Sequence, residues 1–154
     1  MEPVSERELT ITRVFDAPAR TLFLAYSKPE YLLRWFGPVG YPLSLCEMDF
    51  RVGGRYRFAM KGPDGTLMTP FGGEYLEILP GAKISYSNTM EHPGAETMIV
   101  TVTFAEHGSQ TTLSIHTLFA SIAQMKTHVR MGYEQGVGSG LTQLADVVSE
   151  LVRS

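Results

Sequence analysis

Two short segments that meet at Gly53-Gly54 constrain the fold more than any other part of the sequence. In each segment apolar and polar residues alternate, as is typical of a β-strand with one buried face. The paired glycines favour a reversal of the chain between the two strands. The sequence therefore predicts an antiparallel hairpin with an aromatic and Met-rich buried face, made of Met48, Phe50, Tyr56, Phe58 and Met60.

Turn residues divide most of the remaining chain into short strands. Pro80-Gly81, His92-Pro93-Gly94 and His107-Gly108-Ser109 each separate two segments of alternating character. Because the turns are short, neighbouring strands are expected to pair as an antiparallel meander. Gly72-Gly73, inside one of these segments, indicates a bulge or a bend in the sheet. The expected strands are residues 8–15, 42–51, 55–61, 67–79, 83–90, 96–105 and 111–119.

Two short helices are expected between the first two strands. Asp16-Ala17-Pro18 marks the start of the first helix, because proline is tolerated in the first helical turn. Ser27-Lys28-Pro29-Glu30 matches a capping box and predicts the start of the second. That helix should end near Phe36, because Gly37-Pro38 disfavours its continuation.

The C-terminal region gives the strongest helical signal. Ser121-Ile122-Ala123-Gln124 is a capping box that opens it. From Tyr133 to Leu151, apolar residues recur at spacings of three and four and form one stripe. The same region contains glycines, each of which costs on the order of 1 kcal/mol relative to Ala in a helix interior. These glycines are Gly132, Gly136, Gly138 and Gly140.

Two interpretations account for these glycines. In the first, the helix breaks there and its ordered part begins near Ser139. In the second, the helix lies so close to the sheet that the missing side chains leave room for a backbone contact or for a ligand. The second is favoured, because Tyr133 and Val137 continue the apolar stripe through the glycines.

The composition limits the classes of partner and location. The length of 154 residues suits one domain over residues 1–154. A net charge of -3 argues against a nucleic-acid partner, since phosphate binding needs a basic face. Cys46 is the only cysteine, which excludes an internal disulfide and fits the cytoplasm. No signal peptide and no membrane-spanning apolar run is found, so a cytoplasmic protein without membrane insertion is expected.

Several motifs occur in an order that is specific to one family. Through them the chain resembles the START-like superfamily, also called SRPBCC. Within it, the chain is similar to the branch named after the C-terminal domain of the activator of heat-shock-protein-90 ATPase. The resemblance covers nearly the whole chain. The motifs are Phe15-Asp16-Ala17-Pro18, Arg34-Trp35-Phe36-Gly37-Pro38, Asp49-Phe50-Arg51-Val52-Gly53-Gly54-Arg55-Tyr56, Gly62-Pro63-Asp64-Gly65, Gly73-Glu74-Tyr75-Leu76-Glu77-Ile78, Gly132-Tyr133 and Leu141-Thr142-Gln143-Leu144.

The resemblance implies an α+β helix-grip fold. In this fold a curved antiparallel sheet of six to seven strands, two short helices and a long C-terminal helix enclose an apolar cavity. The resemblance implies no shared catalytic residue and no cofactor, and fold alone does not settle function. Phe36, Val52 and Tyr133 stand where the family commonly has Trp, Pro and Trp, so the volume of the cavity is expected to differ.

The residues expected to contact a ligand are mostly aromatic or apolar. Packing in the core would account equally well for many of them. Met side chains adapt to ligands of different shape, and tyrosine hydroxyls could orient a polar end of a ligand. The alternation around His116 leaves its face open. The candidates are Trp35, Phe36, Met48, Phe50, Tyr56, Phe58, Met60, Phe71, Tyr75, Tyr86, Met98, His116, Tyr133 and Val137.

The sequence contains no arrangement typical of a catalytic or metal site. His and Cys residues at metal-binding spacing are absent, as is a Gly-x-Ser-x-Gly nucleophile elbow. Glu74 and Glu77 are expected on opposite faces of their strand, so that one of them would point inward.

Three functions remain open. Binding of an apolar small molecule without a chemical step is favoured. The family resemblance also allows a module that stimulates a chaperone ATPase. A third function is a cyclase or hydrolase reaction that uses His116, a tyrosine or an inward glutamate. An exposed sheet edge would also allow a homodimer.

Overall fold

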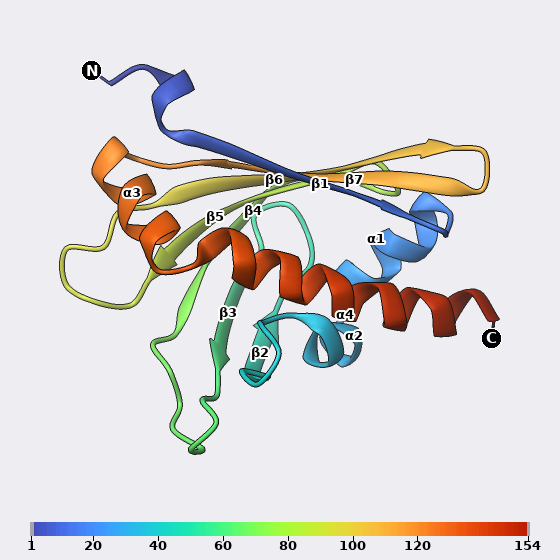
Figure 1. Ribbon diagram of the computed structural model, residues 1–154, viewed down its shortest axis with the longest axis horizontal. Coiled ribbons are helices and arrows are strands. Elements are labelled where there is room, and N and C mark those ends of the chain that lie inside the picture. Colours follow the sequence, from blue (N-terminus) through green and yellow to red (C-terminus); the bar gives the residue numbers. More distant parts are fainter. Residues whose placement is uncertain (1, 154) are drawn as a thin grey trace.

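The computed structural model describes residues 2–153 and contains a seven-stranded antiparallel sheet with the strand order β1-β7-β6-β5-β4-β3-β2 (Figure 1). A short 3-10 turn, η1, precedes the first strand. The elements are η1 (Val4–Glu6), β1 (Glu8–Phe15), α1 (Ala19–Ser27), α2 (Pro29–Trp35), β2 (Leu43–Met48), β3 (Arg55–Met60), β4 (Phe71–Leu79), β5 (Lys83–Met90), β6 (Met98–His107), β7 (Gln110–Leu118), α3 (Ile122–Arg130) and α4 (Tyr133–Arg153).

The helices lie on one side of the sheet, and α4 crosses it (Figure 1). Helices α1 and α2 pack beside α4, and α3 covers the end of the sheet where α4 begins. Between these layers lies a core whose largest fully buried side chains include Leu22, Ile84, Leu113, Phe119 and Leu144. The predicted α+β helix-grip architecture is confirmed, with seven strands.

The predicted hairpin at Gly53-Gly54 is confirmed, because β2 and β3 pair antiparallel with Met48 opposite Tyr56. The bulge, however, is not at Gly72-Gly73. The register between β4 and β5 shifts between Tyr75 and Glu77.

Gly72 and Gly73 have a different role. A Cβ atom at Gly73 would collide with the carbonyl oxygen of Ser87, and one at Gly72 would collide with that of Tyr56. At the same place the Glu74 N–H donates to Ser87 Oγ at 3.0 Å. These glycines therefore permit close approach of neighbouring strands.

Of the two predicted capping boxes, one is confirmed in its N-cap bond, although the Gln124 side chain accepts from the Ala120 N–H, and the other is wrong. Ser121 Oγ accepts a hydrogen bond from the Gln124 N–H at 3.0 Å and caps α3. Ser27, in contrast, belongs to the last turn of α1, where its hydroxyl donates to the Leu24 carbonyl oxygen at 2.8 Å. Helix α2 has Lys28 at its N-cap and Pro29 in its first turn, without a side-chain cap.

The glycines of the C-terminal region have two roles. Gly132, with a φ of 88°, separates α3 from α4, so the break lies before the predicted position near Ser139. The glycines after it lie inside α4 and give close contact with other segments. A Cβ atom at Gly140 would lie 3.4 Å from the Trp35 carbonyl oxygen, and one at Gly138 would lie 3.6 Å from Arg13 Nη2. The first interpretation is therefore wrong, because α4 begins at Tyr133; of the second, the backbone contact is found at Gly140, but with the end of α2 and the connection after it rather than with the sheet.

Arg13 interrupts the apolar face of β1, and α4 explains why this is tolerated. Its guanidinium donates to Thr142 Oγ1 at 2.9 Å. Gly138 lies next to the guanidinium, and a Cβ atom there would only be in ordinary van der Waals contact with it.

Replacing Gly138 by Ala is expected to stabilise the protein. Its Cβ would meet only the flexible end of Arg13, while the helix would gain about 1 kcal/mol in propensity. We expect the melting temperature to rise by roughly 2–4 °C.

Gly73→Ala is the matched comparison, since its Cβ would collide with backbone. We expect it to lower the free energy of unfolding by about 2 kcal/mol or more. Denaturant unfolding measures the free energy of unfolding of both variants. Equal changes in the two would contradict the expectation that a Cβ fits at Gly138 but collides with backbone at Gly73.

Candidate functional site

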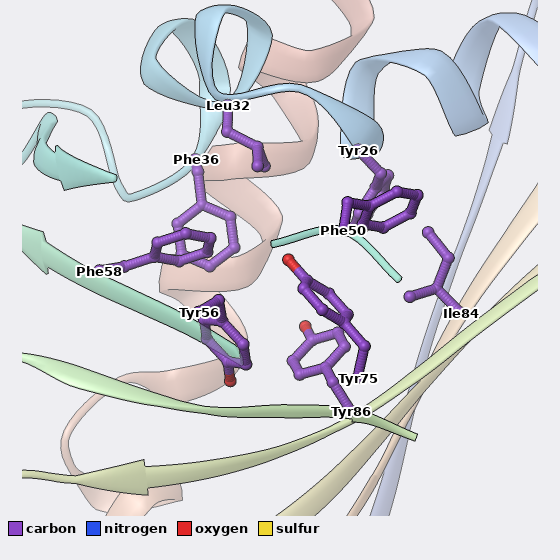
Figure 2. Close-up of a pocket in the computed structure, with 9 residues that line it drawn as sticks. All are labelled: Tyr26, Leu32, Phe36, Phe50, Tyr56, Phe58, Tyr75, Ile84 and Tyr86. Atoms are coloured by element: carbon purple, nitrogen blue, oxygen red, sulfur yellow. The ribbon is translucent and has the colours of Figure 1, made fainter. Parts of the chain in front are cut away.

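An interior space of about 20 Å³ lies between the short helices and the concave face of the sheet (Figure 2). This volume would hold about one water molecule, whereas ligand pockets usually measure roughly 300–1,000 Å³. Seven of the nine side chains around it are aromatic. The lining consists of Tyr26, Leu32, Phe36, Phe50, Tyr56, Phe58, Tyr75, Ile84 and Tyr86, called the aromatic shell below.

The rings of the aromatic shell pack against one another. The centroids of Tyr56 and Phe58 are 4.9 Å apart, and those of Phe50 and Tyr75 are 5.1 Å apart. Phe36 meets Phe58 edge to face at 5.4 Å. These separations are typical of favourable aromatic pairs, so the small volume reflects a well-packed interior.

The shell is built from two kinds of support. Tyr56, Phe58, Tyr75, Ile84 and Tyr86 project from the central strands β3, β4 and β5. The residues Phe36 and Phe50, in contrast, lie in connections just after α2 and β2.

Helix α4 holds the connection that carries Phe36. The Gln143 amide donates to the Gly37 carbonyl oxygen at 2.7 Å, and Ser139 Oγ accepts from the Val39 N–H at 2.9 Å. The connection that carries Phe50 is tied to β4, because the Gly53 N–H donates to the Tyr75 carbonyl oxygen at 2.8 Å. Hydrogen bonds therefore hold the backbone close to Phe36 and to Phe50, although both residues lie outside the helices and strands.

The hydroxyl groups of the shell differ in their partners. Tyr56 donates to the Ser87 carbonyl oxygen at 2.7 Å, and its hydroxyl points away from the middle of the shell (Figure 2). The hydroxyls of Tyr75 and Tyr86 point inward, and neither forms a hydrogen bond with residues 2–153. Burial raises the pKa of both phenols, with smaller contributions from neighbouring groups, so both remain uncharged donors at neutral pH.

A further unsatisfied polar atom lies along β5. In the part of the chain that the structure describes, Asn88 Oδ1 is buried without a partner. Alternation places Asn88 on the same face of β5 as Tyr86. The concave face therefore carries unpaired polar atoms at two places.

Six of the fourteen residues predicted to contact a ligand lie in the aromatic shell: Phe36, Phe50, Tyr56, Phe58, Tyr75 and Tyr86. The rings of Trp35 and Phe71 lie directly behind Phe36, at 5.6 and 6.2 Å. Five others contribute to the core without lining the space: Met48, Met60, Met98, Tyr133 and Val137. The Tyr133 hydroxyl shares a hydrogen bond with Thr117 Oγ1 at 2.8 Å.

His116 is separated from the shell. Its Nε2 lies 2.8 Å from Oε1 of Glu8, the first residue of β1. Both side chains are about one-third exposed. On β7 the neighbours Ile115 and Thr117 are buried, so His116 points to the outer face.

Three shell residues were not among the predicted ligand contacts. Tyr26 and Leu32 come from α1 and α2, and Ile84 comes from β5. Tyr26 lies among the buried residues of α1. A helical apolar stripe predicts burial but does not specify which of its side chains faces the sheet.

The shell contains no charged side chain. Glu77 pairs with Lys83 at 2.9 Å on the outer face, and Glu74 lies opposite Arg55 in the ladder. The expectation that one glutamate points inward is wrong, because the bulge after Tyr75 rotates Glu77 outward.

Cys46 is half-buried on β2, and burial raises the pKa of its thiol to about 11. No cluster of three or more His, Cys, Asp or Glu side chains suited to a metal ion occurs among residues 2–153. Over the same residues, no helix has the length and apolar character needed to cross a membrane.

A second hollow, of about 560 Å³, is open and lies over the outer face of β3, β4 and β5. Arg57 and Glu91 form a bidentate pair there, with distances of 2.7 and 2.9 Å. Both side chains are more than 40% exposed, so the hollow is a solvated polar groove rather than an enclosed site.

The sequence matches the model of a protein family described as activator of Hsp90 ATPase homolog 1-like protein over residues 16–149. This match spans most of the chain. No curated protein matches the sequence at a significant level.

Solved structures of several bacterial proteins have the same fold. A crystal structure from Chromobacterium violaceum is 30% identical, covers 92% of this chain and 96% of its own, and has a TM-score of 0.80. An NMR structure from Arthrobacter aurescens is 25% identical, covers 97% and 90%, and has a TM-score of 0.87. A crystal structure from Nitrosomonas europaea is 24% identical, covers 97% and 99%, and has a TM-score of 0.86.

The buried phenols predict how stability depends on pH. Burial raises the pKa of Tyr26, Tyr56 and Tyr75 above the ordinary value of 10.0. Above pH 10 the unfolded chain therefore releases protons that the folded chain retains, and stability falls as the pH rises. Each phenol should lower the free energy of unfolding by up to about 1.4 kcal/mol per pH unit.

Denaturant unfolding between pH 9 and 12 measures this slope, and near-ultraviolet absorbance follows phenolate formation. In Tyr75→Phe the fall in unfolding free energy should be shallower by the contribution of one phenol, up to about 1.4 kcal/mol per pH unit. Ionisation of the buried phenols while the protein remains folded would contradict the expectation.

Proposed function

Since the chain belongs to the activator of Hsp90 ATPase homolog 1-like family, we propose that it binds a small, mainly apolar molecule inside the aromatic shell. The observation that carries this proposal is the pair of inward hydroxyls on Tyr75 and Tyr86, which lack partners within an otherwise apolar interior. Both hydroxyls border the interior space and are therefore available to a bound molecule. Asn88 Oδ1, also on β5, is fully buried without a partner among the described residues, which costs about 1–3 kcal/mol. Such atoms usually have a partner in a folded protein.

Binding requires the shell to expand, because about 20 Å³ cannot hold a ligand. The two aromatic side chains outside the regular elements, Phe36 and Phe50, are the natural ones to move. Each ring must give up edge-to-face contacts worth about 0.5–1.5 kcal/mol per pair. Contacts with the ligand would replace them.

The lining supports binding rather than catalysis. Its only ionisable side chains are tyrosines, and burial raises the pKa of all four of them. Acid–base catalysis at neutral pH needs a group that titrates near the working pH. Cys46 on β2 carries the only thiol of the chain, and its raised pKa keeps that thiol in the unreactive protonated form.

The proposal predicts that the protein purified from its own host carries a small apolar molecule. Native mass spectrometry, followed by denaturing release, detects and identifies it. Ile84→Phe should reduce the bound fraction at least several-fold, because the larger ring fills the space inside the shell.

Val14→Phe, on the exposed face of β1, is the matched control and should leave the bound fraction unchanged. If wild-type protein carried no ligand and also took up none from a mixture of apolar compounds, the binding function would be wrong. Equal loading of Ile84→Phe would place the ligand elsewhere.

A second candidate is stimulation of a chaperone ATPase, which the description of the family names. Two exposed apolar side chains in the connections after α2 and β3 favour an interaction surface: Val39 is 69% exposed and Leu67 is 54% exposed. The two segments are joined through Lys61, which pairs with Leu67 and donates its N–H to the Pro42 carbonyl oxygen at 2.9 Å.

If this second function is correct, the protein should raise the ATPase rate of the host's Hsp90-type chaperone. The double variant Val39→Asp/Leu67→Asp should lose most of the effect, because both substitutions replace exposed apolar side chains with charges. Val4→Asp, also at an exposed valine, is the control. No stimulation at saturating wild-type protein would exclude this function.

A further inference from the structure

We infer that the molecule bound in the aromatic shell is uncharged and presents an oxygen acceptor to the hydroxyl groups of Tyr75 and Tyr86. This inference rests on the proposed binding function and adds the chemical class of the ligand. Three properties of the shell carry it: the absence of charge in its lining, the two unpaired donors, and the direction in which those donors point.

The first property excludes charged ligands. The ionisable side chains nearest to the shell along β3 and β4 belong to the outer face, where Arg57 pairs with Glu91 and Glu77 pairs with Lys83. A carboxylate or ammonium group inside the shell would therefore be buried without a counter-ion. Such burial costs several kcal/mol for each unpaired charge.

The second property argues against a pure hydrocarbon. A ligand without polar atoms would seal both hydroxyls in an apolar interior and leave them unpaired. In contrast, a ligand with an acceptor would relieve this penalty at the moment of binding. Sites built around hydrogen-bonding groups discriminate strongly against analogues that lack the partner.

The third property selects an acceptor. Both hydroxyls point toward the middle of the shell (Figure 2). A phenol oxygen shares its lone pair with the ring, so the group donates a hydrogen bond more readily than it accepts one. Because burial keeps both phenols protonated, each retains its donor. A carbonyl or ether oxygen is the matching group.

Three probes of similar shape separate these chemistries. They are 2-acetylnaphthalene, which has a neutral oxygen acceptor, 2-ethylnaphthalene, which has none, and 2-naphthoate, which is an anion. NMR titration of wild-type protein and of Tyr75→Phe/Tyr86→Phe gives the dissociation constants. Trp35, the only tryptophan, packs 5.6 Å from Phe36 and provides an indole signal near the shell.

We expect the ratio of ketone to hydrocarbon affinity to fall roughly tenfold in the double variant, because two hydrogen bonds are lost while the rings remain. Binding of the hydrocarbon should be unchanged or slightly stronger. Naphthoate should bind at least tenfold more weakly than the ketone to wild-type protein. Tyr41→Phe, which removes an exposed hydroxyl outside the shell, is the control and should leave the ratio unchanged.

The outcomes distinguish this inference from the function on which it rests. If ketone and hydrocarbon both bind and the double variant leaves their ratio unchanged, the inference is wrong and the binding function stands. Tightest binding of naphthoate would also overturn the inference alone. If none of the three probes binds wild-type protein, the function and the inference are both overturned. Thermal unfolding of each variant confirms that the comparison is made on folded protein.

Discussion

The close contact between α4 and the connection after α2 is the constraint on which the interior depends. Gly140 leaves room for the Trp35 carbonyl oxygen, and Gln143 donates to the Gly37 carbonyl oxygen at 2.7 Å. Gly140 costs about 1 kcal/mol of helix propensity, and the hydrogen bonds between α4 and this connection offset that cost. Because of this contact, α2 is held over the sheet and Phe36 is placed against Phe58. The aromatic shell is thus closed from the helix side.

The sequence was sufficient to predict the architecture because its signals are local. Alternation identified the strands, and the turn residues between them implied antiparallel pairing. The two errors have different causes. The Ser27 hydroxyl donates to the Leu24 carbonyl oxygen within α1, a local alternative to capping α2. The bulge lies after Tyr75, because the pairing with β5 and not the glycine pair sets the register there. Gly72 and Gly73 instead allow the backbones of neighbouring strands to come close together.

The candidate site could be predicted only in part. Four of the five strand residues of the shell, all except Ile84, followed from alternation, and Phe36 followed from the family resemblance. Tyr26 and Leu32 did not, because a helical apolar stripe does not specify which residue of the stripe meets the sheet. The volume of the interior depends on the rotamers of seven rings and on the distance between helix and sheet. Neither quantity is encoded in a local pattern.

The bulge in β4 also has a consequence for how such a protein could change over generations. With Leu76 as the extra residue, Glu77 faces solvent and the interior stays neutral. Removal of Leu76 alone would leave Glu77 directly after Tyr75, and alternation would keep its carboxylate on the outer face. A change that removed the bulge but kept the residue, by shifting the pairing of β4 with β5 by one position, would instead turn the carboxylate of Glu77 toward the concave face. The neutral interior thus depends on how β4 pairs with β5, and not only on which residues line it.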